Sequence, residues 1–425
     1  MTAPGRRRGG LPGLLAWCLF DWANSPVPTV VITFVFASYF ARGIVGDEVA
    51  GTALWSWGLA ASGILVALLA PIVGAIADAG GRRKPWIFAC SALTVVTTAL
   101  LWFAAPDPSW TFYALALVVL VNMGFELGMV FYNAMLPDLA SGERVGRISG
   151  WAWSAGYFGG LACLILVLYG LILAEPPPFG LSNEQAEDVR AAMPLLSIWF
   201  IVFGWPMFMF TADRPSAGLT KREAVRSGLR RLMTTLANMG QHKAIVRFLI
   251  ARLFYIDGLN TLFGLGGVYA ATAFSMDEAE VIKFAIALNV TAGLGAMSFA
   301  WIDDLLGAKF TIVFSVAALA ILGSAILLVH DVTWFWILGM ALGIFIGPTQ
   351  SASRSMMARL APPELTGEMF GLFALSGRVT AFLGPLLVGA VALAADSQRL
   401  GMAVIIVFLA IGLVLMLPLR EPGRD

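Results

Sequence analysis

The sequence predicts an all-α membrane protein with twelve transmembrane helices in two six-helix halves. The first reason is composition: of 425 residues, 59% are hydrophobic and only 12% are charged, whereas a soluble domain usually carries about a quarter charged residues. The mean hydropathy is +0.84. The second reason is that apolar runs of about 20 residues, the length of a membrane-spanning helix, recur from end to end. The third is an internal repeat that divides the chain into two similar parts.

Apolar windows define the twelve predicted spans. They are residues 15–40, 53–77, 85–105, 110–134, 148–173, 194–212, 245–273, 281–302, 310–329, 333–357, 367–394 and 400–419. An even number of spans places both termini on the same side of the membrane.

The loops between these spans differ in charge from one side to the other. The basic side carries Arg6 to Arg8, Arg82, Arg83, Lys84, Arg144, Arg147, Lys221, Arg222, Arg226, Arg230, Arg231, Lys243, Lys309, Arg359 and Arg420. The opposite loops are acidic and carry Asp47, Glu48, Glu184, Glu187, Asp188, Asp277, Glu278, Glu280 and Asp331. Because basic loops are retained in the cytoplasm, we expect a multi-pass cell-membrane protein with both termini cytoplasmic.

A basic linker joins the sixth and seventh spans. Thr220 and Glu223 have the spacing of a capping box, and apolar residues then repeat at helical spacing, namely Val225, Leu229, Leu232 and Leu236. This pattern predicts an amphipathic helix on the inner membrane surface, with its basic residues near anionic headgroups. The predicted organisation is therefore an N-terminal half at 1–212, a linker at 213–244 and a C-terminal half at 245–425.

The two halves share three sequence matches in the same order. Asp21-Trp-Ala-Asn24-Ser25 in the first span matches Asp257-Gly-Leu-Asn260-Thr261 in the seventh. The segment 78–83 after the second span matches the segment 304–309 after the eighth. The third match compares Leu139, Ala140, Glu143, Gly146 and Gly150 with Leu360, Ala361, Glu364, Gly367 and Gly371. Together they predict a parallel repeat whose axis lies along the membrane normal.

The stretch GAIADAGGRRKP, residues 74–85, resembles the signature of the major facilitator superfamily between its second and third spans. The resemblance implies the twelve-helix major facilitator fold. It also implies that a charged cluster latches the two halves on the cytoplasmic side. That gating set consists of Asp78, Arg82 and Arg83, with the repeated copy at Asp304 and Lys309. The alternative is that these basic residues only close a tight turn on the positive side.

The first span is more distinctive. Residues 17–25, WCLFDWANS, with TVVITFVF at 29–36, resemble the vacuole-effluxer-like branch of that superfamily. Fungal members of the branch are linked to amino-acid release from vacuoles, and most bacterial members lack an assigned substrate. Pro26 and Pro28 depart from the pattern. We expect these prolines to kink or unwind the span beside Asp21, because proline removes a helical hydrogen bond.

Six ionisable residues fall within the predicted spans: Asp21, Glu126, Arg252, Asp257, Arg354 and Arg378. At the centre of a span each costs about 2.5–3.5 kcal/mol on insertion scales. Such residues face a water-filled cavity or pair with one another. Three acids and three arginines balance, so salt bridges with no role in transport are the alternative to a functional site.

The three acids are the candidates for proton coupling. Asp21 and Asn24 lie on one helix face, and Asp257 and Asn260 repeat that arrangement. The resemblance implies that spans one, four, seven and ten line a central cavity, where both pairs would converge. Glu126 lies in the fourth span, and a carboxyl group in a low-dielectric environment retains its proton more readily. The alternatives are a helix cap for Asp21 and a structural ion pair for Glu126.

The candidate substrate-binding set is Asn24, Asn122, Arg252, Tyr255, Asn260, Gln350, Arg354 and Arg378. Its arginines can bind a carboxylate or phosphate through two hydrogen bonds each. Arg354 is close enough to the inner end of its span to reach the headgroups instead. The set therefore predicts an anionic or zwitterionic solute. For Trp151, Trp153 and Tyr157 in the fifth span we expect aromatic packing.

Nothing in the sequence indicates covalent catalysis, a cofactor or a metal: there is no GxxxxGK[ST] loop and no Cys/His cluster. A net charge of +1 gives no reason to expect nucleic-acid binding. We therefore expect a monomeric secondary transporter that moves a small polar, carboxylate-bearing or amino-acid-like solute by alternating access, coupled to H⁺ rather than Na⁺. The alternatives are a cation-coupled sugar symporter, a lipid translocator, and a transport-inactive membrane sensor or scaffold.

Overall fold

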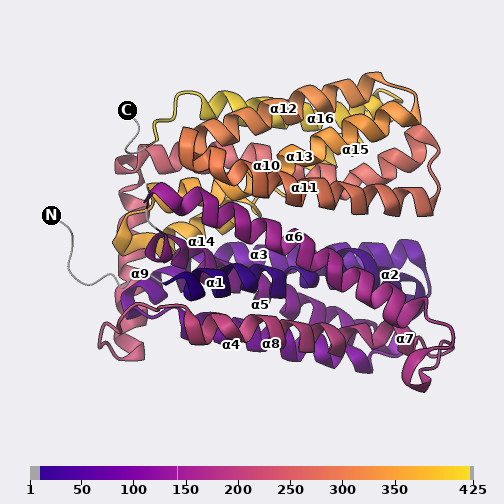
Figure 1. The fold of residues 1–425 in the computed structure, drawn as a ribbon, viewed down its shortest axis with the longest axis horizontal. Coiled ribbons are helices and arrows are strands. Elements are labelled where there is room, and N and C mark those ends of the chain that lie inside the picture. The colour runs from indigo at the N-terminus through magenta and orange to yellow at the C-terminus, as the bar shows by residue number, and fades with distance from the viewer. Residues whose placement is uncertain (1–9, 141, 422–425) are drawn as a thin grey trace.

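The computed structural model describes residues 10–140 and 142–421, and all regular structure in these ranges is helical (Figure 1). Arg6 to Arg8, part of the basic set, lie outside the described residues. The first half comprises α1 (Leu11–Asn24), η1 (Val27–Phe34), α2 (Val35–Tyr39), η2 (Phe40–Val45), α3 (Glu48–Gly80), α4 (Lys84–Leu100), α5 (Thr111–Leu139), α6 (Val145–Val167) continued by η6 (Leu168–Ile172), α7 (Glu187–Arg190) and α8 (Ala192–Phe210). The second comprises α10 (Lys243–Phe274), α11 (Glu278–Leu306), α12 (Ala308–Leu328), α13 (Val332–Leu360), α14 (Thr366–Ser376), α15 (Leu383–Ala394) and α16 (Gln398–Met416).

The two halves form separate layers in Figure 1, joined through α9 (Lys221–Ala237), which crosses one end of the bundle. We call the end that carries α9 the linker side and the opposite end the far side. Among the described residues, eleven helices are long and apolar enough to cross a membrane. The eleventh predicted span, 367–394, is divided into α14 and α15 by a turn at residues 377–382. The twelve-helix, two-half architecture predicted from the sequence fits this arrangement.

The first span becomes a π-helix at its prolines, whereas a kink or an unwound segment was expected. From Val27 to Phe34 the backbone is π-helical and continues into α2. Pro26 and Pro28 have no N–H to donate, so the Trp22 and Asn24 carbonyls lose their α-helical donors. The Trp22 carbonyl accepts a hydrogen bond from the Trp199 indole N–H at 3.3 Å. The hydroxyl of Thr29 donates to the Ser25 carbonyl at 3.0 Å. The hydroxyl of Thr33 likewise donates to the Pro28 carbonyl at 2.8 Å. The span therefore stays continuous while its face beside Asp21 is distorted.

The linker helix begins with the predicted capping box between Thr220 and Glu223. Hydrogen bonds from Thr220 lower the pKa of the Glu223 carboxyl. The buried face of α9 is formed by Ala224, Gly228, Leu232 and Thr235. Of the predicted apolar repeat, only Leu232 belongs to this face, and Val225, Leu229 and Leu236 are exposed. The reason is Gly228, which allows α9 to pack directly on the backbone of α3 at Ile76 and so sets its rotation.

The halves meet through small residues on the linker side, where α3 packs on α14 and α6 packs on α11. A Cβ added to Gly371 would lie 2.5 Å from the Ala70 carbonyl oxygen. One added to Gly150 would lie 2.5 Å from the Ala300 Cβ. Gly150 and Gly371 are equivalent positions of the sequence repeat. The repeat therefore marks two places where the halves approach closely.

We predict that Gly371→Val separates the halves on the linker side without unfolding either of them, because the added side chain meets the α3 backbone. Spin labels at Glu143 and Glu364, both exposed, would report a longer distance by double electron–electron resonance in a background without native cysteines. The matched control is Gly389→Val, since no atom lies within 4 Å of its added Cβ. An unchanged distance in Gly371→Val would contradict this account of the interface.

Candidate functional site

A cavity of about 550 Å³ lies between the two halves, within the ~300–1,000 Å³ range of small-molecule sites. Most of its wall is apolar. Of the residues predicted from the sequence, Asp21, Asn24, Glu126, Gln350 and Arg378 line it. The lining on α13 extends from Gln350 to Phe335, near the far-side end of that helix. The cavity thus extends toward the far side and ends near Asp21 on its linker side.

Asp21 and Arg354 form an ion pair between the halves at this linker-side end. The distance from Arg354 Nη1 to Asp21 Oδ2 is 2.9 Å. Both residues are almost fully buried, with 4% and 1% of their surfaces exposed. A buried charge is tolerated only when it is paired and its remaining hydrogen-bonding atoms are satisfied. Asp21 belongs to α1 and Arg354 to α13, so this pair also ties the halves together.

Polar and aromatic groups complete the surroundings of Arg354. It donates to the Ser149 hydroxyl at 2.9 Å and to the Ser149 carbonyl at 2.6 Å. Its guanidinium lies 5.0 Å from the ring centroid of Trp17 and 5.6 Å from that of Trp153, where the faces of the rings attract a cation. Ser149 was not predicted to contribute, although it lies within the repeated segment 139–150.

A second ion pair between the halves joins Glu126 on α5 to Arg378 in the turn between α14 and α15. This pair is more accessible than the first: 14% of the Glu126 side chain and 36% of the Arg378 side chain are exposed. Both residues line the cavity. A ligand in the cavity can therefore reach Arg378 more readily than Arg354.

A hydrogen bond between neutral groups also crosses the cavity. Tyr157 donates to Gln350 Oε1 at 2.5 Å, and both side chains line the cavity. The sequence prediction of aromatic packing therefore misses the polar contact of Tyr157. Trp153 also lines the cavity. The amide of Asn24 is 3.5 Å from the sulfur of Met129.

Five residues of the predicted substrate-binding set do not line the cavity. Arg354 lies at its linker-side end and Asn260 faces the break in the eleventh span. The other three are Asn122, Arg252 and Tyr255. Asn122 donates to the Ser62 hydroxyl at 2.8 Å, between α5 and α3. Arg252 donates to the Phe373 carbonyl at 2.6 Å and lies 3.5 Å from the centroid of that ring. Tyr255 shares a hydrogen bond with Ser353 at 2.7 Å. These contacts hold helices together, so the alternative of structural packing describes their positions.

Asp257 and Asn260 face the break in the eleventh span instead of the cavity. Asp257 is 2% exposed and lies near the Gly384 backbone and the Thr380 hydroxyl. No ion pair among the described residues includes Asp257. The Asn260 amide lies 3.5 Å from the Gly377 carbonyl oxygen. The repeat therefore conserves the spacing of an aspartate and an asparagine, but the two copies have different surroundings.

Asp78 and Asp304 hold equivalent positions in the two halves, and each binds the start of a helix in the other half. Asp78 accepts a hydrogen bond from the Glu368 backbone N–H at 2.9 Å. Asp304 accepts from the Gly146 and Arg147 backbone N–H groups at 2.9 and 3.2 Å. Carboxylates at helix N-termini satisfy free N–H groups and interact favourably with the helix dipole. Both contacts hold the linker side closed.

The basic members of the predicted gating set have different positions. Arg83 is buried within the first half and pairs with Asp138 at 2.7 Å and with Asp78 at 3.4 Å. Burial, followed by the neighbouring Arg214, lowers the pKa of Arg83, and the two carboxylates oppose that shift. Arg82 is exposed. The backbone N–H of Lys309 donates a hydrogen bond to the Glu421 carboxylate at 3.0 Å.

Glu421 has an equivalent in the first half that the sequence matches did not include. Asp213 accepts hydrogen bonds from the backbone N–H groups of Arg83 and Lys84, at 3.0 and 3.1 Å. Glu421 accepts in the same way from Ala308 and Lys309, at 3.2 and 3.0 Å. Each acid follows the last helix of its half and caps the third span of that half. The position after the sixth and twelfth spans is the signal that could have revealed them.

Taken as a whole, the site places two acid–arginine pairs between the two halves of the chain. In each pair the carboxylate neutralises the arginine, and a ligand carboxylate could take the place of either acid. Among the described residues no group of three or more His, Cys, Asp or Glu side chains could hold a metal ion.

Comparison with known proteins agrees with this arrangement. Residues 41–422 match the family described as "Vacuole effluxer Atg22 like". The chain is 27% identical over 424 residues to the uncharacterized MFS-type transporter YxiO of Bacillus subtilis, covering 94% of this chain and 93% of that one. It is 23% identical over 347 residues to autophagy-related protein 22 of Kluyveromyces lactis, covering 73% of this chain and 68% of the relative.

Among solved structures, the chain is similar in fold to the proton:xylose symporter XylE of the major facilitator superfamily. The TM-score is 0.72 at 13% sequence identity, with 96% of each chain covered. The fold is therefore the major facilitator fold. The chain belongs to the vacuole effluxer Atg22-like family, and it is a multi-pass membrane protein of the major facilitator superfamily.

Proposed function

We propose that this protein is a proton-coupled secondary transporter that moves a small, amino-acid-like solute bearing a carboxylate by alternating access. The observation that carries the proposal is the pair of acid–arginine contacts between the halves at the cavity, Asp21–Arg354 and Glu126–Arg378. Arginine binds a carboxylate of any origin, so the solute can compete with the acids of the protein. The family resemblance supports the amino-acid-like class of solute.

In this proposal the solute carboxylate binds first at Arg378, the more accessible of the two arginines. It displaces Glu126, which then lies in a cavity of low polarity without its cation and takes up a proton. Proton uptake and solute binding are thereby coupled at one place. Asn24, Gln350 and Tyr157 are positioned on the cavity wall to meet the polar groups of the solute.

The buried Asp21–Arg354 pair controls access from the linker side. Opening that side must break this pair as well as the caps that Asp78 and Asp304 provide. Protonation of Asp21, or competition by the solute for Arg354, would weaken the pair. The linker side faces the cytoplasm in this proposal, as the basic loops favour, and the cavity in the present structure extends away from it. Asp257, which has no cationic partner among the described residues, is the third candidate for the coupling proton.

Uptake of amino acids into proteoliposomes under an imposed pH gradient tests the coupling. We expect gradient-driven accumulation in the native protein. Glu126→Gln should abolish that dependence, because the amide cannot exchange a proton, while solute exchange without a gradient persists. Asp21→Asn and Asp257→Asn test the other two carboxyl groups. Unchanged gradient dependence in all three variants would refute proton coupling through these residues.

Replacing Arg378 tests the solute carboxylate. Arg378→Gln should raise the KM for a carboxylate-bearing solute by roughly 10- to 100-fold, since a hydrogen bond to a charged group contributes about 1.5–3 kcal/mol. The KM for the corresponding amide-capped solute should change little. Initial rates of uptake measure both values.

The control for this variant is Arg420→Gln, which removes an exposed arginine far from the cavity and should leave both KM values unchanged. Thermal unfolding of the variants verifies that they fold. An equal rise in KM for the carboxylate and its amide would contradict the role of Arg378 in charge recognition.

A further inference from the structure

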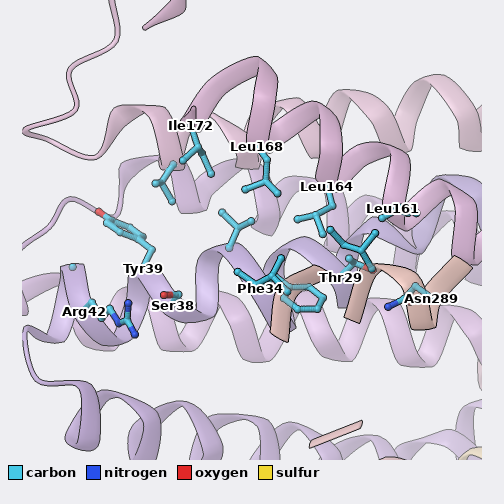
Figure 2. Close-up of a pocket in the computed structure, with 15 residues that line it drawn as sticks. Thr29, Phe34, Ser38, Tyr39, Arg42, Leu161, Leu164, Leu168, Ile172 and Asn289 are labelled. Atoms are coloured by element: carbon cyan, nitrogen blue, oxygen red, sulfur yellow. The ribbon is translucent and has the colours of Figure 1, made fainter. Parts of the chain in front are cut away.

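A second pocket adjoins the central cavity on the far side. It has a volume of about 360 Å³ and lies between the first span, α6 with η6, and α11 (Figure 2). Thr29, Phe34 and Asn289 line both this pocket and the central cavity. We call it the far-side crevice.

The crevice is elongated along the helix axes. Figure 2 shows Leu161, Leu164, Leu168 and Ile172 in a row on α6 and η6, facing the first span. Ile172 follows Leu161 by eleven residues, which corresponds to roughly 16 Å at ~1.5 Å per helical residue. The hydrocarbon core of a bilayer is ~30 Å thick. The apolar wall therefore has about the depth of one leaflet.

Three polar side chains in the crevice already have hydrogen-bond partners within the protein. The Thr29 hydroxyl donates to the Ser25 carbonyl at 3.0 Å, and the Tyr39 hydroxyl donates to the Ala104 carbonyl at 2.8 Å. The Asn289 amide donates to the Ala285 carbonyl at 2.8 Å. The crevice therefore offers few hydrogen bonds to a polar occupant. An apolar pocket of this kind does not favour water.

A cation lies at the far-side rim of the crevice. Arg42 lines the pocket at the end opposite Thr29 and Asn289 (Figure 2). Its side chain is 56% exposed and is 3.0 Å from Glu48. Arginine at the end of a span reaches the headgroup region, where it attracts anionic lipid headgroups.

We propose that the far-side crevice binds one acyl chain of an anionic phospholipid from the far-side leaflet, with its headgroup beside Arg42. The length of the apolar wall, the internal hydrogen bonds of Thr29, Tyr39 and Asn289 and the cation at the rim all fit this occupant. The site is distinct from the solute site, although Thr29, Phe34 and Asn289 form part of both. It goes beyond solute transport, and solute uptake can fail while lipid binding persists.

Photolabelling in nanodiscs tests the site. The probe is phosphatidylglycerol with a diazirine at the end of one acyl chain, and the comparison is phosphatidylcholine with the same chain. We expect labelling of residues 161–172 and 282–289 to exceed that of the lipid-exposed surface of α12, and to be stronger with phosphatidylglycerol. Leu168→Trp should fill the crevice and reduce the labelling several-fold. Arg42→Gln should reduce phosphatidylglycerol labelling to the phosphatidylcholine level.

The matched control is Tyr169→Trp, because Tyr169 is 70% exposed and does not line the crevice; its labelling should equal that of the native protein. If Leu168→Trp does not fold, Ile286→Phe fills the crevice from the opposite wall on α11. Labelling that is equal on α6 and α12 and unaffected by either filling variant would mean ordinary lipid contact only, and would overturn the proposal.

Discussion

The ion pair between Asp21 and Arg354 is the contact on which the arrangement of the two halves depends. It joins α1 to α13 at the linker-side end of the cavity, where neither charge is accessible to solvent. An unpaired arginine at the centre of a span costs at least about 2.5–3.5 kcal/mol, and removing one partner of a buried pair costs ~3–5 kcal/mol. The halves can therefore separate on this side only when something else neutralises the two charges.

The remaining contacts between the halves reinforce this pair. Asp78 and Asp304 cap helices of the opposite half, and Gly150 and Gly371 allow the backbones to approach around them. Each of these contacts has an equivalent in the other half, so the linker side is closed by two similar sets. The Asp21–Arg354 pair has no such equivalent, because Asp257 faces the break between α14 and α15. The asymmetry gives the cavity one buried acid–arginine pair at its base and one more accessible pair, Glu126–Arg378.

Hydropathy and the internal repeat predict the spans and the two halves, because these depend on local sequence. The prolines of the first span also predict its distortion, since missing N–H groups act locally. The pairing of Arg354 with Asp21 and of Arg378 with Glu126 could not be predicted, because each joins residues separated by more than 250 positions. Arg252 was predicted to be a site residue because a charged side chain within a span is unusual. In the structure its guanidinium donates to the Phe373 carbonyl and the Ser376 hydroxyl and lies over the Phe373 ring.

A double-mutant cycle on Asp21 and Arg354 tests the central claim most directly. The fraction of molecules closed on the linker side would be measured from the spin-label distance between positions 143 and 364 for the native protein, Asp21→Asn, Arg354→Gln and the double variant. The account predicts that each single change opens the linker side, because it leaves a buried charge unpaired, and that the double variant closes again in part. The coupling energy should be at least ~1.5 kcal/mol, as for close charge pairs elsewhere. Strictly additive effects, or no opening in either single variant, would contradict it.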